Sequence, residues 1–290
     1  MHPAPSIIAF TTLSGLGLGL LFWLGIDPDP SGGWVRFTFF TLAFGMTGIG
    51  LAASTFHLGH PERALKAFSQ WQSSWLSREA WAAASAMLVM GLYAFCLIVL
   101  GVHVAVLGWL GALLCMATVG TTSMIYAQLK TIPRWHHWST PVLFFALSLG
   151  GGALLAGKIS MAIFLIALAG GVQAYWFWQG DLRFGDAGAT IGTATGLGDR
   201  GSVRAFEPPH TGTNYLLKEF VYVVGRKHGD KLRLISLGLM TVLPLMILLT
   251  NPHHLMAIIA VLSHVTGVVV SRWLFFAQAE HVVGLYYGKR

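Results

Sequence analysis

Charged residues are scarce in this sequence. Only 10% of its 290 residues are Asp, Glu, Lys or Arg, and 55% are hydrophobic. A soluble domain is typically about 25% charged, so the composition excludes an ordinary soluble globular protein. The mean hydropathy of +0.66 indicates that most of the chain contacts lipid or other apolar helices. The 35 glycines and 11 tryptophans fit a membrane protein, because small residues let membrane helices approach closely and Trp favours the water interface.

Cysteine is also scarce. The sequence has only Cys96 and Cys115, with no CxxC motif and no ferredoxin-like run of cysteines. This chain therefore cannot hold an iron–sulfur cluster by itself. Both cysteines fall inside predicted membrane spans, where we interpret them as small buried apolar side chains.

Basic residues are missing from the N-terminal stretch "MHPAPSIIAF". The stretch lacks the basic start of a secretory signal and shows no small-residue cleavage site, so we interpret the first apolar run as an uncleaved span. The net charge of +7 does not indicate nucleic-acid binding. The basic residues lie between apolar runs rather than on one soluble face.

Long apolar runs make up most of what is present. A membrane span needs about 20 mostly apolar residues, and these runs are too apolar around the whole helix to be soluble amphipathic helices. Barrel strands would be shorter and would alternate. We therefore expect an all-α integral membrane protein, a bundle of eight transmembrane helices that forms a single domain over residues 1–290. The predicted spans are residues 5–26, 35–58, 79–101, 103–128, 139–157, 159–180, 232–250 and 254–277.

Three connections between the predicted spans are long: residues 59–78, 129–138 and 181–231. The third is polar and glycine-rich, and its first half is predicted to be irregular. Its later stretch "NYLLKEFVYVVGRK" is predicted as an amphipathic helix on the membrane surface. A flexible linker is one interpretation of this connection. We favour a docking loop, because such long loops in a compact bundle are usually functional or disordered and its aromatic residues argue against disorder.

The distribution of Lys and Arg predicts the orientation. Sixteen of the 18 basic residues fall on the side that holds both termini and the three long connections, and only Arg36 and Lys158 fall on the other side. The positive-inside rule therefore places both termini and these connections in the cytoplasm, for a protein of the bacterial inner membrane.

The stretch "FHLGHPERALKAF", residues 56–68, thus lies at the cytoplasmic membrane surface. His57 ends the second predicted span and Glu79 opens the third, where the helix dipole stabilises a carboxylate. Reduction of a quinone takes two electrons and two protons, which a histidine and a carboxylate can supply. Arg63 or Arg78 is positioned to hold charge on a quinone oxygen. The alternative is that these are ordinary residues of the membrane interface.

The motifs "ASTFHLGHPERALKAF", "LSREAWAAA" and "YAQLKTIPRWHHWSTPVLFF" resemble the anchor subunits of the DMSO reductase family of molybdopterin oxidoreductases. The resemblance implies an eight-span anchor that binds a ferredoxin-like iron–sulfur subunit and a molybdopterin catalytic subunit, and that exchanges electrons with ubiquinone or menaquinone. It implies quinone-binding roles for His57 and Glu79, and it extends with less specificity to Arg63 and Tyr126. The molybdenum and iron–sulfur centres would lie only in the partner subunits, with no metal and no haem in this chain.

The loop 181–231 and the charge balance depart from the enterobacterial anchors of this family, in which the same motif would face the periplasm. A cytoplasmic motif implies a cytoplasmic catalytic partner. The stretch "EPPHTGTNYLLKEF" is similar to the anchors of sulfite dehydrogenases, which oxidise sulfite to sulfate and pass electrons to quinone. We therefore expect the quinone-reducing subunit of a sulfite:quinone type of oxidoreductase.

Two other functions stay open at the level of sequence. A cytochrome b-type anchor needs two axial ligands at matched depth, and His264 is the only His near the middle of a predicted span. We interpret His264 instead as hydrogen-bonded to a neighbouring helix. A small-solute transporter usually shows internal repeats and broken helices, and no repeat is evident. Arg272, near the cytoplasmic end of the last span, is expected to extend toward the interface.

Overall fold

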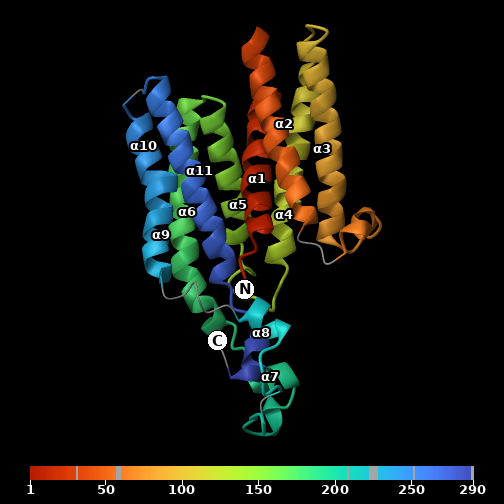
Figure 1. Ribbon diagram of the computed structural model, residues 1–290, viewed down its shortest axis with the longest axis vertical. Coiled ribbons are helices and arrows are strands. Elements are labelled where there is room, and N and C mark those ends of the chain that lie inside the picture. The colour runs from red at the N-terminus through yellow and green to blue at the C-terminus, as the bar shows by residue number, and fades with distance from the viewer. Residues whose placement is uncertain (31, 57–59, 208, 222–227, 251, 289–290) are drawn as a thin grey trace.

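The computed structural model describes residues 1–30, 32–56, 60–207, 209–221, 228–250 and 252–288, and every regular element within these ranges is helical. Figure 1 shows a bundle of long helices, with the N-terminus at one end and the short helices α7 and α8 beyond that end. This arrangement brings the connections that carry most of the basic residues to one end of the bundle.

Seven helical segments are long and apolar enough to cross a membrane. The fifth predicted span, residues 139–157, is instead a shorter apolar helix of 17 residues. It is about 26 Å long at 1.5 Å per residue, against about 30 Å of hydrocarbon. The bundle helices are α1 (Pro5–Ile26), α2 (Gly33–Thr55), α3 (Trp75–Ile98), α4 (Ala105–Ala127), the shorter α5 (Ser139–Leu155), α6 (Ile159–Asp186), the interrupted segment α9 (Gly229–Leu237) with η4 (Gly238–Val242) and α10 (Leu243–Leu248), and α11 (His254–Ala277).

Two helix ends differ from the predicted span bounds. The helix α3 begins at Trp75 rather than at residue 79, so Glu79 lies in the second turn and not in the first. The helix α6 continues to Asp186 instead of ending at residue 180, so the connection after it begins later than expected. Polar residues at the ends of both helices sit outside the apolar runs, which is why hydropathy alone placed the ends too far inside.

Helix α1 is central, because it packs against α2, α4, α5 and α11. Its contact with α5 depends on glycine. A Cβ at Gly19 would overlap the carbonyl oxygen of Ser148, and a Cβ at Gly152 would overlap the backbone of Gly19. Membrane helices associate through such close backbone approach rather than through a hydrophobic driving force.

The seventh segment contains a π-helical turn, η4, directly before Pro244. Proline has no N–H, so the carbonyls one turn before it lose a helical donor. The carbonyl of Met240 accepts instead from Nδ1 of His264 at 2.6 Å, and that of Leu239 accepts from Ser263 at 2.7 Å. The interpretation of His264 as bonded to a neighbouring helix is confirmed.

The connection after α6 is organised around the C-terminal segment. It contains α7 (Ile191–Thr195), η2 (Gly198–Arg200) and α8 (Tyr215–Phe220), and the C-terminal segment contains η5 (Val282–Tyr287). We call α7, η2, α8 and η5 together the cap. The first half of this connection, predicted to be irregular, thus contains short helices. In the stretch predicted as an amphipathic helix, the part up to residue 221 contains a helix of six residues, α8. Residues 222–227 lie outside the described residues.

Hydrogen bonds and ring contacts join the cap. The hydroxyl of Tyr286 donates to the carbonyl of Ala194 at 3.1 Å, and Asn214 donates to the hydroxyl of Tyr287 at 3.1 Å. The ring of Phe220 lies 4.8 Å from that of His281. These contacts show that the described part of the connection has defined packing, which disfavours a flexible linker.

Candidate functional site

Glu79 is a buried carboxyl near the end of the bundle that carries the cap. Its residue is 6% exposed, and its Oε1 accepts a hydrogen bond from the hydroxyl of Thr122 on α4. Helices α3 and α4 pack against each other along their length, which brings the two side chains together. An acidic side chain within a membrane bundle is a candidate functional group.

The Thr122 hydroxyl can satisfy this carboxyl in both protonation states. It lies within hydrogen-bond distance of Glu79 and also 2.9 Å from the carbonyl oxygen of Thr118 on its own helix. When Glu79 is ionised, the hydroxyl donates to it. When Glu79 is protonated, the carboxyl donates to Oγ1 of Thr122, which then donates to Thr118. The arrangement is therefore suited to a group that takes up and releases a proton.

Tyr126 lies one turn further along α4 than Thr122, on the same helix face. It is buried in an aromatic cluster, with its ring 5.2 Å from Trp135 and 5.3 Å from Phe275. Glu79 and Tyr126, two of the residues that the sequence motifs indicate, are thus related through Thr122, which bonds to Glu79 and lies one turn from Tyr126 on α4. The sequence analysis missed Thr122.

The other residues indicated by the motifs are placed differently. His57 lies outside the described residues. Arg63, on η1 (Pro61–Phe68), is exposed, and its Nε lies 3.9 Å from a carboxylate oxygen of Glu62.

Arg78 closes the turn before α3, donating to the carbonyls of Trp71 at 3.0 Å and Gln72 at 2.7 Å. Among the described residues, neither arginine forms a hydrogen bond or ion pair with Glu79.

Trp75, which follows that turn, lies under the Arg78 guanidinium at 4.4 Å. The tryptophan therefore packs on an arginine of this chain in the structure.

Arg272 corrects an expectation. Its side chain does not extend to the interface, because the residue is 2% exposed and its guanidinium carbon lies 3.8 Å from the ring centre of Phe144. A small cavity beside it has room for about one water molecule. The residues that line this cavity are Thr11, Ser14, Gly15, Leu18, Val119, Thr122, Phe144 and Arg272. The sequence signal was a charged residue inside a predicted span, and the expected direction of its side chain was wrong.

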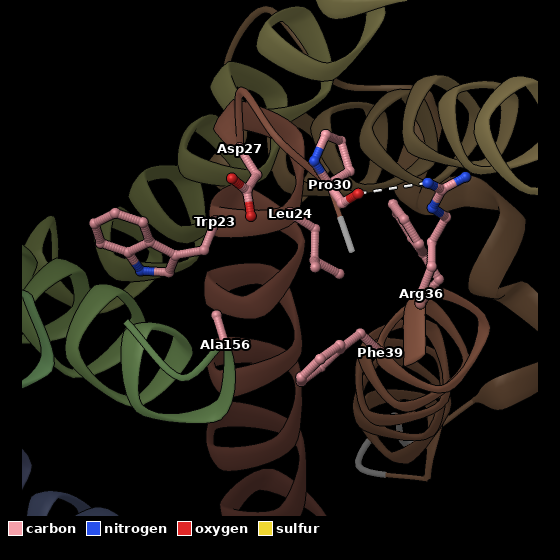
Figure 2. Close-up of a pocket in the computed structure, with 8 residues that line it drawn as sticks. Trp23, Leu24, Asp27, Pro30, Arg36, Phe39 and Ala156 are labelled. Carbon is pink, nitrogen blue, oxygen red and sulfur yellow. Dashed lines mark hydrogen bonds between the residues drawn. The ribbon is translucent and has the colours of Figure 1, made fainter. Parts of the chain in front are cut away.

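A second, larger cavity lies at the opposite end of the bundle (Figure 2). It is lined by α1, α2 and the turn after α5, with Asp27 and Arg36 as its charged residues. Asp27 pairs with Lys158 at 2.9 Å, and Arg36 donates to the carbonyls of Leu97 at 2.6 Å and Pro30 at 3.4 Å. These bonds hold the outer ends of the helices together, and the cavity is remote from Glu79.

A charge cluster fixes the loop 129–138 to the bundle. Asp181 on α6 accepts from Arg134 at 2.5 Å and from Arg233 on α9 at 2.6 and 2.7 Å. Burial lowers the pKa of Arg134, and the bond to Asp181 works against that effect. Gly180 makes this possible, because a Cβ there would overlap the Arg134 guanidinium.

His264 is the histidine on which the cytochrome alternative depends. Among the described residues, no three His, Cys, Asp or Glu side chains are grouped as metal ligands. His264 uses Nδ1 to bind Met240, and its ring lies directly against α5, where a Cβ at Gly151 would be 3.0 Å from Nε2. A haem on this histidine would have to displace α5.

Comparison with known proteins identifies the class. The chain belongs to the family of DMSO reductase anchor subunits (DmsC), which it matches over residues 6–288. The family expected from the sequence motifs is confirmed, and the chain is a membrane anchor subunit of this type.

Among individual relatives, the chain is 30% identical to a sulfite dehydrogenase subunit of Allochromatium vinosum over an alignment of 327 positions, which covers 99% of both chains. It is 34% identical over 172 residues to the anaerobic dimethyl sulfoxide reductase chain YnfH of Escherichia coli, covering 56% of this chain and 58% of that one. No solved structure matches the chain.

Proposed function

We propose that this chain is the quinone-reactive anchor subunit of a sulfite-oxidising molybdopterin oxidoreductase. It passes electrons from an iron–sulfur partner subunit to membrane quinone. The observation that carries the proposal is a buried carboxyl, Glu79, with a hydroxyl partner suited to both of its protonation states, in a chain that belongs to the anchor family. The full-length similarity to a sulfite dehydrogenase subunit supports sulfite as the substrate of the partner.

The chemistry needs protons as well as electrons. Oxidation of sulfite with one water gives sulfate, two protons and two electrons, and a quinone takes up two electrons and two protons to become quinol. In this proposal Glu79 and His57 deliver the protons, and Arg63, Arg78 and Tyr126 contribute to quinone binding. Of these, Tyr126 has the support of lying one turn along α4 from Thr122, the hydrogen-bond partner of Glu79.

The proposed orientation places the cap and both termini in the cytoplasm, in a bacterial inner membrane. The bundle end that carries the cap also carries most of the Lys and Arg residues, as the positive-inside rule requires of a cytoplasmic face. The iron–sulfur subunit would dock on the cap and on the loops beside it, with the molybdopterin subunit beyond. Protons for the quinone then come from the side where sulfite is oxidised, so turnover separates little or no charge.

Mild extraction of the tagged chain from its native membrane tests the assembly. We expect molybdenum and iron to copurify, with more iron than molybdenum, and the preparation to reduce a quinone analogue when sulfite is added. A preparation that contains both metals but reduces no quinone contradicts the role of the anchor. A haem absorption band in place of molybdenum would favour a cytochrome.

Substitution of the carboxyl tests the site. We expect Glu79→Gln to lower sulfite-dependent quinone reduction by about 100-fold, within the range for loss of a general acid or base, and His57→Ala to act in the same direction. Oxidation of sulfite with ferricyanide should be unchanged. The matched control is Glu62→Gln, since Glu62 is exposed and pairs with His60 at 2.9 Å. Equal loss with both acceptors would indicate failed assembly instead.

A further inference from the structure

Arg272 carries a charge that the described residues do not fully pair. Its Nε and Nη1 atoms are buried and have no hydrogen-bond partner among them. The ring of Phe144, 3.8 Å from the guanidinium carbon, supplies a cation–π contact. A buried cation with two unused donors is costly, and in a membrane bundle such a group usually marks function.

The cavity beside Arg272 has the chemistry of a water site. The hydroxyl of Thr11 donates to a backbone carbonyl of its own helix at 2.9 Å, and that of Ser14 does so at 2.6 Å. Their oxygens therefore remain able to accept a hydrogen bond from a water, while Arg272 offers donors. Thr122, the partner of Glu79, lines the same cavity. A water needs two to four polar partners, and this cavity provides them.

We propose that Arg272 is a positioning residue of the quinone-reducing site, which holds one water molecule between its guanidinium and the Thr122 hydroxyl and thereby links itself to Glu79. The water accepts from Arg272 and donates to the hydroxyl oxygen of Thr122. No ion pair joins Arg272 and Glu79 among the described residues, so the link runs through the water and Thr122. This inference rests on the proposed function of Glu79.

The link has a consequence for each proton transfer. When Glu79 has given up its proton, Thr122 donates to the carboxylate, and the water donates to Thr122. The guanidinium at the far end of this chain of hydrogen bonds then provides positive charge for the anion. When Glu79 holds its proton, Phe144 still stabilises the guanidinium. Both states of the carboxyl are thus accommodated without a change of fold.

The test measures quinone reduction and ferricyanide reduction by the assembled, sulfite-oxidising complex. We expect Arg272→Gln to lower kcat for quinone reduction by about tenfold or more, with the KM for quinone and the ferricyanide activity unchanged. The solvent deuterium isotope effect on quinone reduction should rise, because proton delivery becomes slower. Arg272→Lys should restore part of the rate. The control is Arg36→Gln, which removes an arginine at the opposite end of the bundle.

A double variant separates this inference from the proposed function. If Arg272 acts through Glu79, the variant with both Glu79→Gln and Arg272→Gln should reduce quinone no more slowly than Glu79→Gln alone. Three results would overturn the role of Arg272 while the proposed role of Glu79 stands. They are a double variant slower than Glu79→Gln by the full factor seen for Arg272→Gln alone, an effect of Arg272→Gln on KM alone, and an equal loss of activity with ferricyanide. If Glu79→Gln has no effect in an active complex, the proposed site and this inference both fail.

Discussion

At the scale of single residues, the proposed site contains one hydroxyl between two acceptors. Thr122 faces the Glu79 carboxyl on one side and the Thr118 carbonyl on its own helix on the other. Valine has nearly the same shape as threonine but no hydroxyl, so it would leave the buried carboxyl without its partner. An unsatisfied buried polar group costs about 1–3 kcal/mol.

We therefore expect Thr122→Val to slow sulfite-dependent quinone reduction by about tenfold, corresponding to about 1.4 kcal/mol. Assembly and ferricyanide reduction should be retained. The matched control is Thr121→Val, because the Thr121 hydroxyl donates only to carbonyls of its own helix, at 2.9 Å. Equal effects of the two substitutions would show that Thr122 has no special relation to Glu79.

At the scale of helices, close backbone contact between α1 and α5 supports the site, because Thr11 and Ser14 on α1 line the cavity beside Arg272. Gly152→Ala would drive a methyl group into the backbone of Gly19. We expect a loss of about 1–3 kcal/mol in stability, as for overpacking of a core, measured as a lower Tm of the purified chain in detergent.

Gly171→Ala on α6 is the control for that substitution, since nothing lies within 4 Å of a Cβ at Gly171. It should leave Tm unchanged or raise it slightly, because alanine favours a helix over glycine. If Gly152→Ala behaves in the same way, the contact between α1 and α5 is looser than the structure shows.

At the scale of the whole molecule, His281 joins two parts of the cap, α8 and η5. Its Nδ1 accepts from the N–H of Val283 at 3.0 Å, and its ring lies against Phe220. Burial, and then the positive N-terminal amino group, lowers the pKa of His281 below its ordinary value of 6.5. The folded cap thus favours the neutral form of His281, since protonation of Nδ1 would remove the acceptor for the Val283 N–H.

This direction gives the pH dependence of the cap. A histidine with a lowered pKa contributes stability that is complete above about pH 6.5 and is lost as the pH falls toward the folded-state pKa. We expect amide hydrogen exchange at residues 282–287 to accelerate between about pH 8 and pH 5, after correction for the intrinsic exchange rate. His281→Asn keeps a capping acceptor that does not titrate, so it should remove this pH dependence. An unchanged pH dependence in that variant would contradict the role of His281.

Much of the architecture could be predicted from the sequence. The first and last spans have the predicted bounds, residues 5–26 and 254–277, because hydropathy summed over about 20 residues is a local property that needs no knowledge of packing. The family could be predicted from motifs that lie near the ends of the spans. Among the described site residues, Glu79 and Tyr126 could be named in the same way.

Only the tertiary structure decided which polar groups meet. The packing of α3 against α4 brought Glu79 to Thr122, and the packing of α11 against α1 and α5 buried Arg272 on Phe144 instead of letting it reach the interface. The direction of a side chain around a helix depends on which helices surround it, and nearly uniform apolar spans carry little periodicity to reveal that. The sequence by itself therefore determined the spans, the charge distribution and the family, while packing determined the site.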